Sequence, residues 1–222
     1  SILPADQELS AIFKEHFVIW KPRDTVGGDF YWVKKIKNGA VVIVADCTGH
    51  GVPGAFMTMA VNSILSEIVL KDKTVDPSTI LKELDKLLKQ HLNKGQHNRQ
   101  VDDGLEAGVC YICDDHTLVF AGAKIDLYIK RAGELIRLRG INKGVGFRKS
   151  NPVKLENHIL ATDEEDAFYI TTDGYPDQNG GLKDYAFGRT RFAETIEKVY
   201  RLPMAEQKKA FLDALEQYMR NN

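Results

Sequence analysis

Two residue periodicities divide the chain into blocks of strands and helices, and the order of these blocks limits the folds that it can adopt. Short apolar runs fill the first fifty residues, apolar residues then recur every three to four positions between about 53 and 95, and short runs return up to residue 171. A second helical block closes the chain. Because strands and helices are segregated, we expect an α+β fold, an α-β-β-α sandwich of two mainly antiparallel sheets flanked by helix pairs, rather than a doubly wound parallel sheet.

The expected strands are short, rich in β-branched and aromatic residues, and separated by turn residues. Asn38-Gly39 predicts a type I′ hairpin between two of them. The expected strands are Phe17–Trp20, Phe30–Ile36, Ala40–Ala45, Leu105–Cys113, Thr117–Ala121, Leu127–Arg131, Glu134–Leu138, His158–Ala161 and Ala167–Thr171.

Four amphipathic helices are expected in the two helical blocks. The second begins with Asp76 as its N-cap and Pro77 as its first residue, and it ends before Gly95. The other three are expected at Pro53–Leu70, Arg191–Tyr200 and Met204–Met219.

Composition excludes several classes of function. Lys and Arg total 30 against 31 Asp and Glu, so the net charge of −1 gives no bulk attraction to nucleic acid or an anionic membrane. No uninterrupted apolar run approaches the roughly 20 residues of a membrane span. With 222 residues and three cysteines, the chain can form one core without disulfides, which is typical of a single cytoplasmic domain.

Three aspartates follow or begin apolar strands beside glycine, where a charged side chain can point into a cleft. Asp29 follows Gly27-Gly28, Asp46 ends the run from Val41, and Asp173 precedes Gly174. Taken singly, such an Asp is usually a turn or a helix cap. Three that converge would repel one another and need a cation, and their oxygen ligands suit Mg²⁺ or Mn²⁺. The sequence therefore predicts a divalent metal centre.

The same aspartates lie in motifs that follow one another along the chain. The motifs are Val26-Gly27-Gly28-Asp29-Phe30-Tyr31, Val44-Ala45-Asp46-Cys47-Thr48-Gly49-His50-Gly51-Val52-Pro53-Gly54-Ala55, Asp103-Gly104-Leu105-Glu106, Phe120-Ala121-Gly122-Ala123 and Thr172-Asp173-Gly174-Tyr175-Pro176-Asp177-Gln178. Together they resemble the motifs of bacterial serine phosphatases related to stage II sporulation protein E, a branch of the metal-dependent protein phosphatase 2C superfamily. The resemblance extends from about residue 12 to residue 200.

The resemblance implies a two-metal phosphatase that acts on phosphoserine or phosphothreonine. It implies that Asp46 bridges two divalent cations, Mn²⁺ or Mg²⁺, and that Cys47 binds one of them through its backbone carbonyl. Asp173 would hold one cation, and Asp29 would serve the other directly or through water. Asp177 matches a position that helps to hold a loosely bound third cation in some relatives.

The implied reaction needs no covalent intermediate. A water that bridges two cations about 3.5–4 Å apart loses its proton readily and attacks phosphorus, while the cations neutralise the phosphoryl oxygens. The chain has no Cys-x5-Arg loop of the kind that cysteine-dependent phosphatases use. Arg23 matches an arginine that contacts substrate phosphate in some relatives, and the alternative is an ordinary solvated arginine.

One family motif is missing from this sequence. Relatives normally finish with an Asp-Asp-x-Thr segment whose Asp is a further metal ligand, whereas this sequence stops at Arg220-Asn221-Asn222 after a helix. We expect residues 1–222 to be one phosphatase domain from a longer sensory or signalling protein, with the missing strand beyond Asn222. The alternative is a catalytically silent binding module on the same fold.

The resemblance also implies a class of partner. Family members commonly act on phosphorylated anti-sigma-factor antagonists, so we expect a small regulatory protein of that type as the substrate. We expect no nucleic acid partner, and any attachment to a membrane would come from other parts of the parent protein.

Overall fold

The computed structural model describes residues 3–22, 26–71, 73–93, 102–147 and 154–220. Its helices are α1 (Asp6–Ser10), α2 (Gly51–Ser66), the π-helical segment η1 (Glu67–Lys71), α3 (Pro77–Asn93), α4 (Gly188–Val199) and α5 (Met204–Arg220). Its strands are β1 (Asp29–Ile36), β2 (Gly39–Cys47), β3 (Leu105–Cys113), β4 (Thr117–Ala123), β5 (Leu127–Arg131), β6 (Glu134–Leu138), β7 (His158–Ala161), β8 (Ala167–Ile170), β9 (Asn179–Gly180) and β10 (Tyr185–Ala186).

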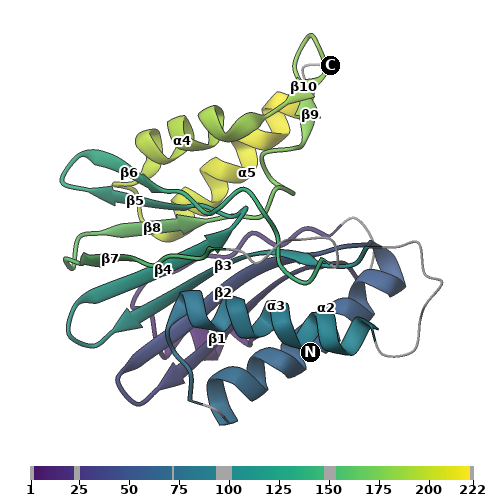
Figure 1. Ribbon diagram of the computed structural model, residues 1–222. Coiled ribbons are helices and arrows are strands. Elements are labelled where there is room, and N and C mark those ends of the chain that lie inside the picture. The colour runs from purple at the N-terminus through teal and green to yellow at the C-terminus, as the bar shows by residue number, and fades with distance from the viewer. Residues whose placement is uncertain (1–2, 23–25, 72, 94–101, 148–153, 221–222) are drawn as a thin grey trace.

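Two antiparallel sheets form the middle layers of the molecule (Figure 1). The larger sheet has the strand order β1-β2-β3-β4-β7, and the smaller has the order β6-β5-β8. A short antiparallel ribbon of β9 and β10 lies near α5. Hairpins join β1 to β2, β3 to β4 and β5 to β6, and longer connections join the other antiparallel pairs.

Helix pairs cover the outer faces of the two sheets (Figure 1). α2 and α3 pack on the larger sheet, where Leu65, Leu84 and Ile43 are fully buried in a shared core. α4 and α5 pack on the smaller sheet around Phe192 and Phe211. A third core fills the space between the sheets. The predicted α-β-β-α sandwich is confirmed.

The alternation of side chains along β2 shows which face carries the polar residues. Val41, Ile43 and Cys47 belong to the core under α2 and α3, whereas Val42 packs against the core between the sheets. Because successive side chains point to opposite faces of a sheet, Asp46 shares the face of Val42 and projects toward the second sheet.

Most expected elements are confirmed, and the exceptions have physical reasons. Leu105–Cys113, Leu127–Arg131, Glu134–Leu138 and His158–Ala161 are strands over the expected residues. The expected strand at Phe17–Trp20 is wrong, because this segment has no regular structure. Phe17 and Ile19 are instead partly buried against the core of the smaller sheet and its helices, so packing on that core explains their apolar character. The short elements α1, β9 and β10 were not expected.

The first hairpin is confirmed, but its turn differs from the expected one. The turn residues are Lys37 and Asn38, and Gly39 is already the first residue of β2, opposite Ile36. Gly39 has a φ of 147°, and a Cβ there would lie 2.1 Å from the carbonyl oxygen of Ile112. The glycine is therefore needed for close approach to β3 and not for a type I′ turn.

α2 and η1 together form a 21-residue helix, Gly51–Lys71, which is long and apolar enough to span a membrane by length and composition. In this fold one side of the helix is buried, with Val61, Leu65 and Ile68 in the core of the larger sheet. Core helices of globular domains commonly have this composition, so the helix gives only weak support for a membrane span.

Asp76 caps α3 as expected. Its Oδ1 accepts hydrogen bonds from the backbone N of Thr79 at 2.8 Å and from the hydroxyl of Ser78 at 2.9 Å, and its Oδ2 accepts one from Asn157. Burial works to raise the pKa of Asp76, but these hydrogen bonds to the carboxylate outweigh it and hold the pKa below its ordinary value. The cap also attaches the start of α3 to the segment before β7.

We predict that Asp76→Ala lowers the free energy of unfolding by about 1 kcal/mol at pH 7, the usual value of an N-cap. A carboxylate whose pKa is depressed by folding contributes stability above its unfolded pKa and loses it as pH falls through the folded pKa. The difference between wild type and variant should therefore shrink below about pH 4. Urea unfolding at several pH values measures it, and a difference that is independent of pH would contradict the assignment.

Candidate metal centre

Three carboxylates form one row across three neighbouring strands of the larger sheet. Asp29 begins β1 and pairs with Asp46 near the end of β2, and Asp46 in turn pairs with Glu106 in β3. Residues directly opposite one another share a face of the sheet, and adjacent strands lie about 4.8 Å apart. Like charges in this arrangement destabilise the sheet unless a cation compensates them.

Asp173 reaches the same place from the smaller sheet. β8 ends at Ile170, and two threonines lead from it to Asp173. A Cβ on the next residue, Gly174, would lie only 3.6 Å from Oδ2 of Asp29. The structure thus brings together Asp29, Asp46 and Asp173, which are far apart in the sequence.

Electrostatics at this point favour positive charge. Burial, and after it the negative charges of Asp29, Asp173 and Glu106, together raise the pKa of Asp46 to about 7. The pKa of Asp173 is also raised, first by burial and then by its acidic neighbours. Lys124 opposes both shifts. The cluster therefore holds more negative charge than its own cation balances.

The donor atoms fit a divalent cation. Oδ1 of Asp29 is buried and has no hydrogen-bond partner, which costs free energy that a bound cation would recover. Carboxylate and carbonyl oxygens are the ligands that Mg²⁺ and Mn²⁺ prefer. Within the described ranges, no three His, Cys, Asp or Glu side chains are already arranged to hold a metal ion. The carboxylates would have to turn toward a common point when a cation draws them together.

The turn before Asp29 lies directly against the loop after Asp46. The backbone N of Cys47 donates a hydrogen bond to the carbonyl of Gly28 at 3.1 Å. A Cβ on Gly28 would lie 2.2 Å from the carbonyl oxygen of Cys47, whereas a Cβ on Gly27 would meet no atom closer than 3.8 Å. Gly28 therefore allows the two ligand-bearing strand ends to approach each other.

Two threonine hydroxyls hold these segments in place. Oγ1 of Thr58, buried in α2, lies 3.2 Å from the carbonyl oxygens of both Gly27 and Gly28. Oγ1 of Thr48 accepts a hydrogen bond from the backbone N of Gly104 at 3.1 Å. α2 and the start of β3 are thus attached to the segments that position Asp29 and the Cys47 carbonyl.

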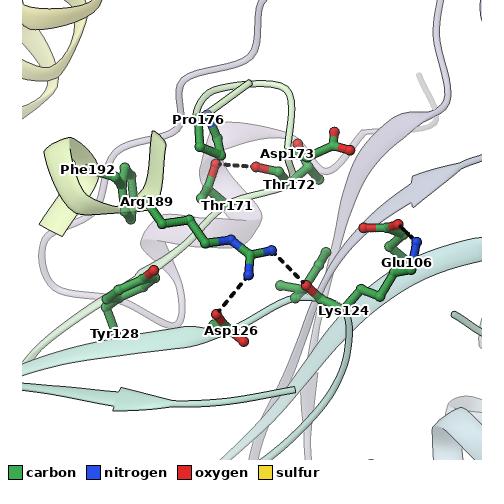
Figure 2. A pocket seen from close by; sticks show the side chains of 11 residues that line it. Glu106, Lys124, Asp126, Tyr128, Thr171, Thr172, Asp173, Pro176, Arg189 and Phe192 are labelled. Carbon is green, nitrogen blue, oxygen red and sulfur yellow. Dashed lines mark hydrogen bonds and ion pairs between the residues drawn. The ribbon is translucent and has the colours of Figure 1, made fainter. Parts of the chain in front are cut away.

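The site contains two residues that were not among the expected site residues. The ammonium of Lys124 lies 2.5 Å from Oε1 of Glu106 (Figure 2). Glu106 lies in a family motif, but its position opposite Asp46 depends on the register of β2 and β3, which the sequence does not reveal. Lys124 follows β4 with a φ of 65°, a left-handed conformation that nothing in the local sequence predicts.

The remaining expected residues have different surroundings. The backbone N of Asp177 donates to the carbonyl of Asp173 at 2.8 Å, and its exposed side chain adds to the charges that raise the pKa of Asp173. The side chain of Cys47 is buried under α2, on the face away from the carboxylates. Arg23 lies outside the described residues.

Comparison with known proteins identifies a family and solved structures that are similar to this chain. The family model described as stage II sporulation protein E (SpoIIE) matches residues 37–222. The SiaA-PP2C domain of Pseudomonas aeruginosa is 34% identical, with a TM-score of 0.87 over 98% of this chain and 84% of that one. A comparison with curated proteins found no match.

Two further solved structures share the fold at lower identity. The PP2C phosphatase domain of SpoIIE from Bacillus subtilis, solved with part of its regulatory domain, is 15% identical, with a TM-score of 0.66 over 90% of this chain and 56% of that one. The RsbU and RsbW domains of a Mycobacterium tuberculosis protein are 17% identical, with a TM-score of 0.70 over 89% of this chain and 53% of that one. The protein phosphatase 2C-like fold expected from the sequence is confirmed.

We predict that Mn²⁺ raises the melting temperature of the wild type, because a ligand of the folded state at 100 times its Kd adds about 2.7 kcal/mol. Asp46→Asn should abolish this shift, and in EDTA the variant should be at least as stable as the wild type because a repelling charge is gone. The exposed Glu164→Gln variant is the control and should keep the shift. An Asp46→Asn variant that still responds to Mn²⁺ would place the cation elsewhere.

Gly28→Ala should weaken Mn²⁺ binding by roughly 10–100-fold, the usual effect of disturbing the groups that orient metal ligands. The added methyl would collide with the Cys47 carbonyl and separate the two strand ends. Gly27→Ala is the matched control, since a methyl there meets only ordinary contacts. Mn²⁺ titration by calorimetry measures both, and equal affinities in the two variants would contradict this role for Gly28.

Proposed function

Because the chain belongs to the stage II sporulation protein E family and has the PP2C phosphatase fold, we propose that it is a metal-dependent protein serine/threonine phosphatase. The observation that supports this most strongly is the meeting of Asp173, from one sheet, with the Asp29, Asp46 and Glu106 row of the other.

We propose roles for the residues of the cluster. Asp46 is in the middle of the row and can serve two cations, Mn²⁺ or Mg²⁺, with Asp29 beside one and Asp173 beside the other. The Cys47 carbonyl is a further ligand, and Asp177 would contribute to a third, weakly bound cation. Bound cations would activate a water and neutralise phosphoryl oxygens. The protein itself fixes the ligands through Gly28, Thr48 and Thr58, and Lys124 offsets part of their negative charge.

We propose a small regulatory protein of the anti-sigma-factor-antagonist type, phosphorylated on serine or threonine, as the substrate. The family match and the likeness in fold to an RsbU domain support this class of partner. The three cysteines are free thiols, which suits a reducing cytoplasm as the place where this domain works. Nucleic acid is not part of the proposal, because the net charge of −1 offers no attraction to it.

We also propose that residues 1–222 are one domain of a longer signalling protein and that an Asp-containing strand of the parent follows Asn222. That strand would add a further carboxylate to the cluster. The catalytically silent binding module remains the alternative, and hydrolysis by the chain with and without the added strand distinguishes the two.

The proposal predicts hydrolysis of p-nitrophenyl phosphate in Mn²⁺ and none in EDTA. Asp46→Asn should lower the rate by roughly 100-fold or more, because cation stabilisation of the reacting phosphate is worth several kcal/mol. The rate of p-nitrophenolate release measures this directly, with Glu164→Gln as the control. Turnover that is insensitive to EDTA would contradict a metal-dependent phosphatase, and absence of turnover with the added strand would favour the binding module.

A further inference from the structure

A recess opens beside the carboxylate row, where the end of β4, the segment after β8 and the start of α4 meet (Figure 2). Glu106, Lys124 and Asp173 line it on the side of the metal centre. Asp126 and Arg189 line it farther from the carboxylate row, and Figure 2 shows the guanidinium of Arg189 pointing into the space between Asp126 and Lys124. A phosphate held at the metal centre would border this recess.

Arg189 is held only loosely. Its Nη1 lies 3.5 Å from Oδ2 of Asp126, and its Nη2 donates to the carbonyl of Lys124 at 3.3 Å. The Asp126 carboxylate already accepts shorter hydrogen bonds, from Arg137 at 2.5 and 2.8 Å and from the backbone N of Gly140 at 2.9 Å. About half of the Arg189 side chain is exposed. Its guanidinium carries five N–H donors, so it has donors to offer a ligand.

The surroundings of Tyr128 also indicate a missing acceptor. Tyr128 lines the recess and is 4% exposed, yet its hydroxyl is buried without a hydrogen-bond partner. Burial is the main cause of its raised pKa, and the charges that act on it are three arginines, Arg137, Arg139 and Arg189, against one nearby carboxylate, Asp126. The buried donor of Tyr128 and the three arginines around it favour an anionic ligand at this end of the recess.

We propose that Arg189 binds the phosphoryl group of the substrate at the metal centre. The inference rests on the proposed phosphatase function and adds a substrate-binding residue to it. Guanidinium and phosphate match as bidentate partners, and the loose contact with Asp126 can be exchanged for this stronger one. Arg189 lies in the first turn of α4. This helix would therefore add a substrate-binding residue to a site whose metal ligands come from both sheets.

Lys124 is less suited to this role although it is closer to the carboxylates. Its ammonium is paired with Glu106, and its charge already offsets those of Asp46 and Asp173. Moving it to a phosphate would leave these carboxylates less compensated. Moving Arg189 leaves no carboxylate without a cation, because Arg137 still neutralises Asp126 when Arg189 moves away.

The test uses inorganic phosphate and the Mg²⁺-loaded protein, with calorimetry as a readout that needs no turnover. Arg189→Gln should weaken phosphate binding by about 10–100-fold, the value of charge-assisted hydrogen bonds, and leave Mg²⁺ affinity unchanged. Arg189→Lys should recover part of the loss. Lys198→Gln removes an exposed charge from the same helix and should bind phosphate like the wild type. In the p-nitrophenyl phosphate assay, Arg189→Gln should raise KM more than it lowers kcat.

The outcomes separate this inference from the phosphatase proposal. Phosphate binding that depends on Arg189, in a protein that has no turnover even with the added strand, would support the binding residue and favour the binding module over the enzyme. Equal phosphate affinity in the wild type, Arg189→Gln and Lys198→Gln would overturn the inference even if the protein is an active phosphatase. Absence of phosphate binding by the Mg²⁺-loaded wild type would overturn it as well.

Discussion

The central constraint in this structure is the mutual repulsion of carboxylates that the strand register places side by side. Asp29, Asp46 and Glu106 lie opposite one another on β1, β2 and β3, and Asp173 approaches them from the smaller sheet. Side chains of one charge at this spacing oppose folding. Burial first, and this repulsion second, raise the pKa of Asp46, and Oδ1 of Asp29 is buried beside it without a hydrogen-bond partner. A divalent cation would compensate the repulsion and give the buried oxygen a partner.

The rest of the fold holds this unfavourable arrangement in place. Three hydrophobic cores, one between the sheets and one under each helix pair, stabilise the sandwich independently of the cluster. Thr58 attaches α2 to the turn before Asp29, and Gly28 lets that turn approach the loop after Asp46. The free energy gained by burying apolar side chains in these cores thus offsets the electrostatic cost of a preassembled site, as is common at functional sites.

The sequence predicts the elements better than their contacts. Strands such as Leu105–Cys113 and the capped helix from Pro77 follow from local periodicity and turn chemistry, which act over a few residues. Phe17–Trp20 was misassigned because apolar residues packed on a core look like a short strand. The aspartates could be found from their positions at strand ends. Glu106 and Arg189 could not, because register and helix placement are set by packing between segments far apart in the chain.

The most direct test of the metal centre is anomalous X-ray diffraction from crystals of this protein grown with Mn²⁺. The account predicts manganese peaks between Asp46 and its neighbours Asp29 and Asp173, with the Cys47 carbonyl oxygen among the ligands and Asp46 turned toward the ions. Manganese bound only at other positions, or an Asp46 carboxylate without a cation at saturating Mn²⁺, would contradict it.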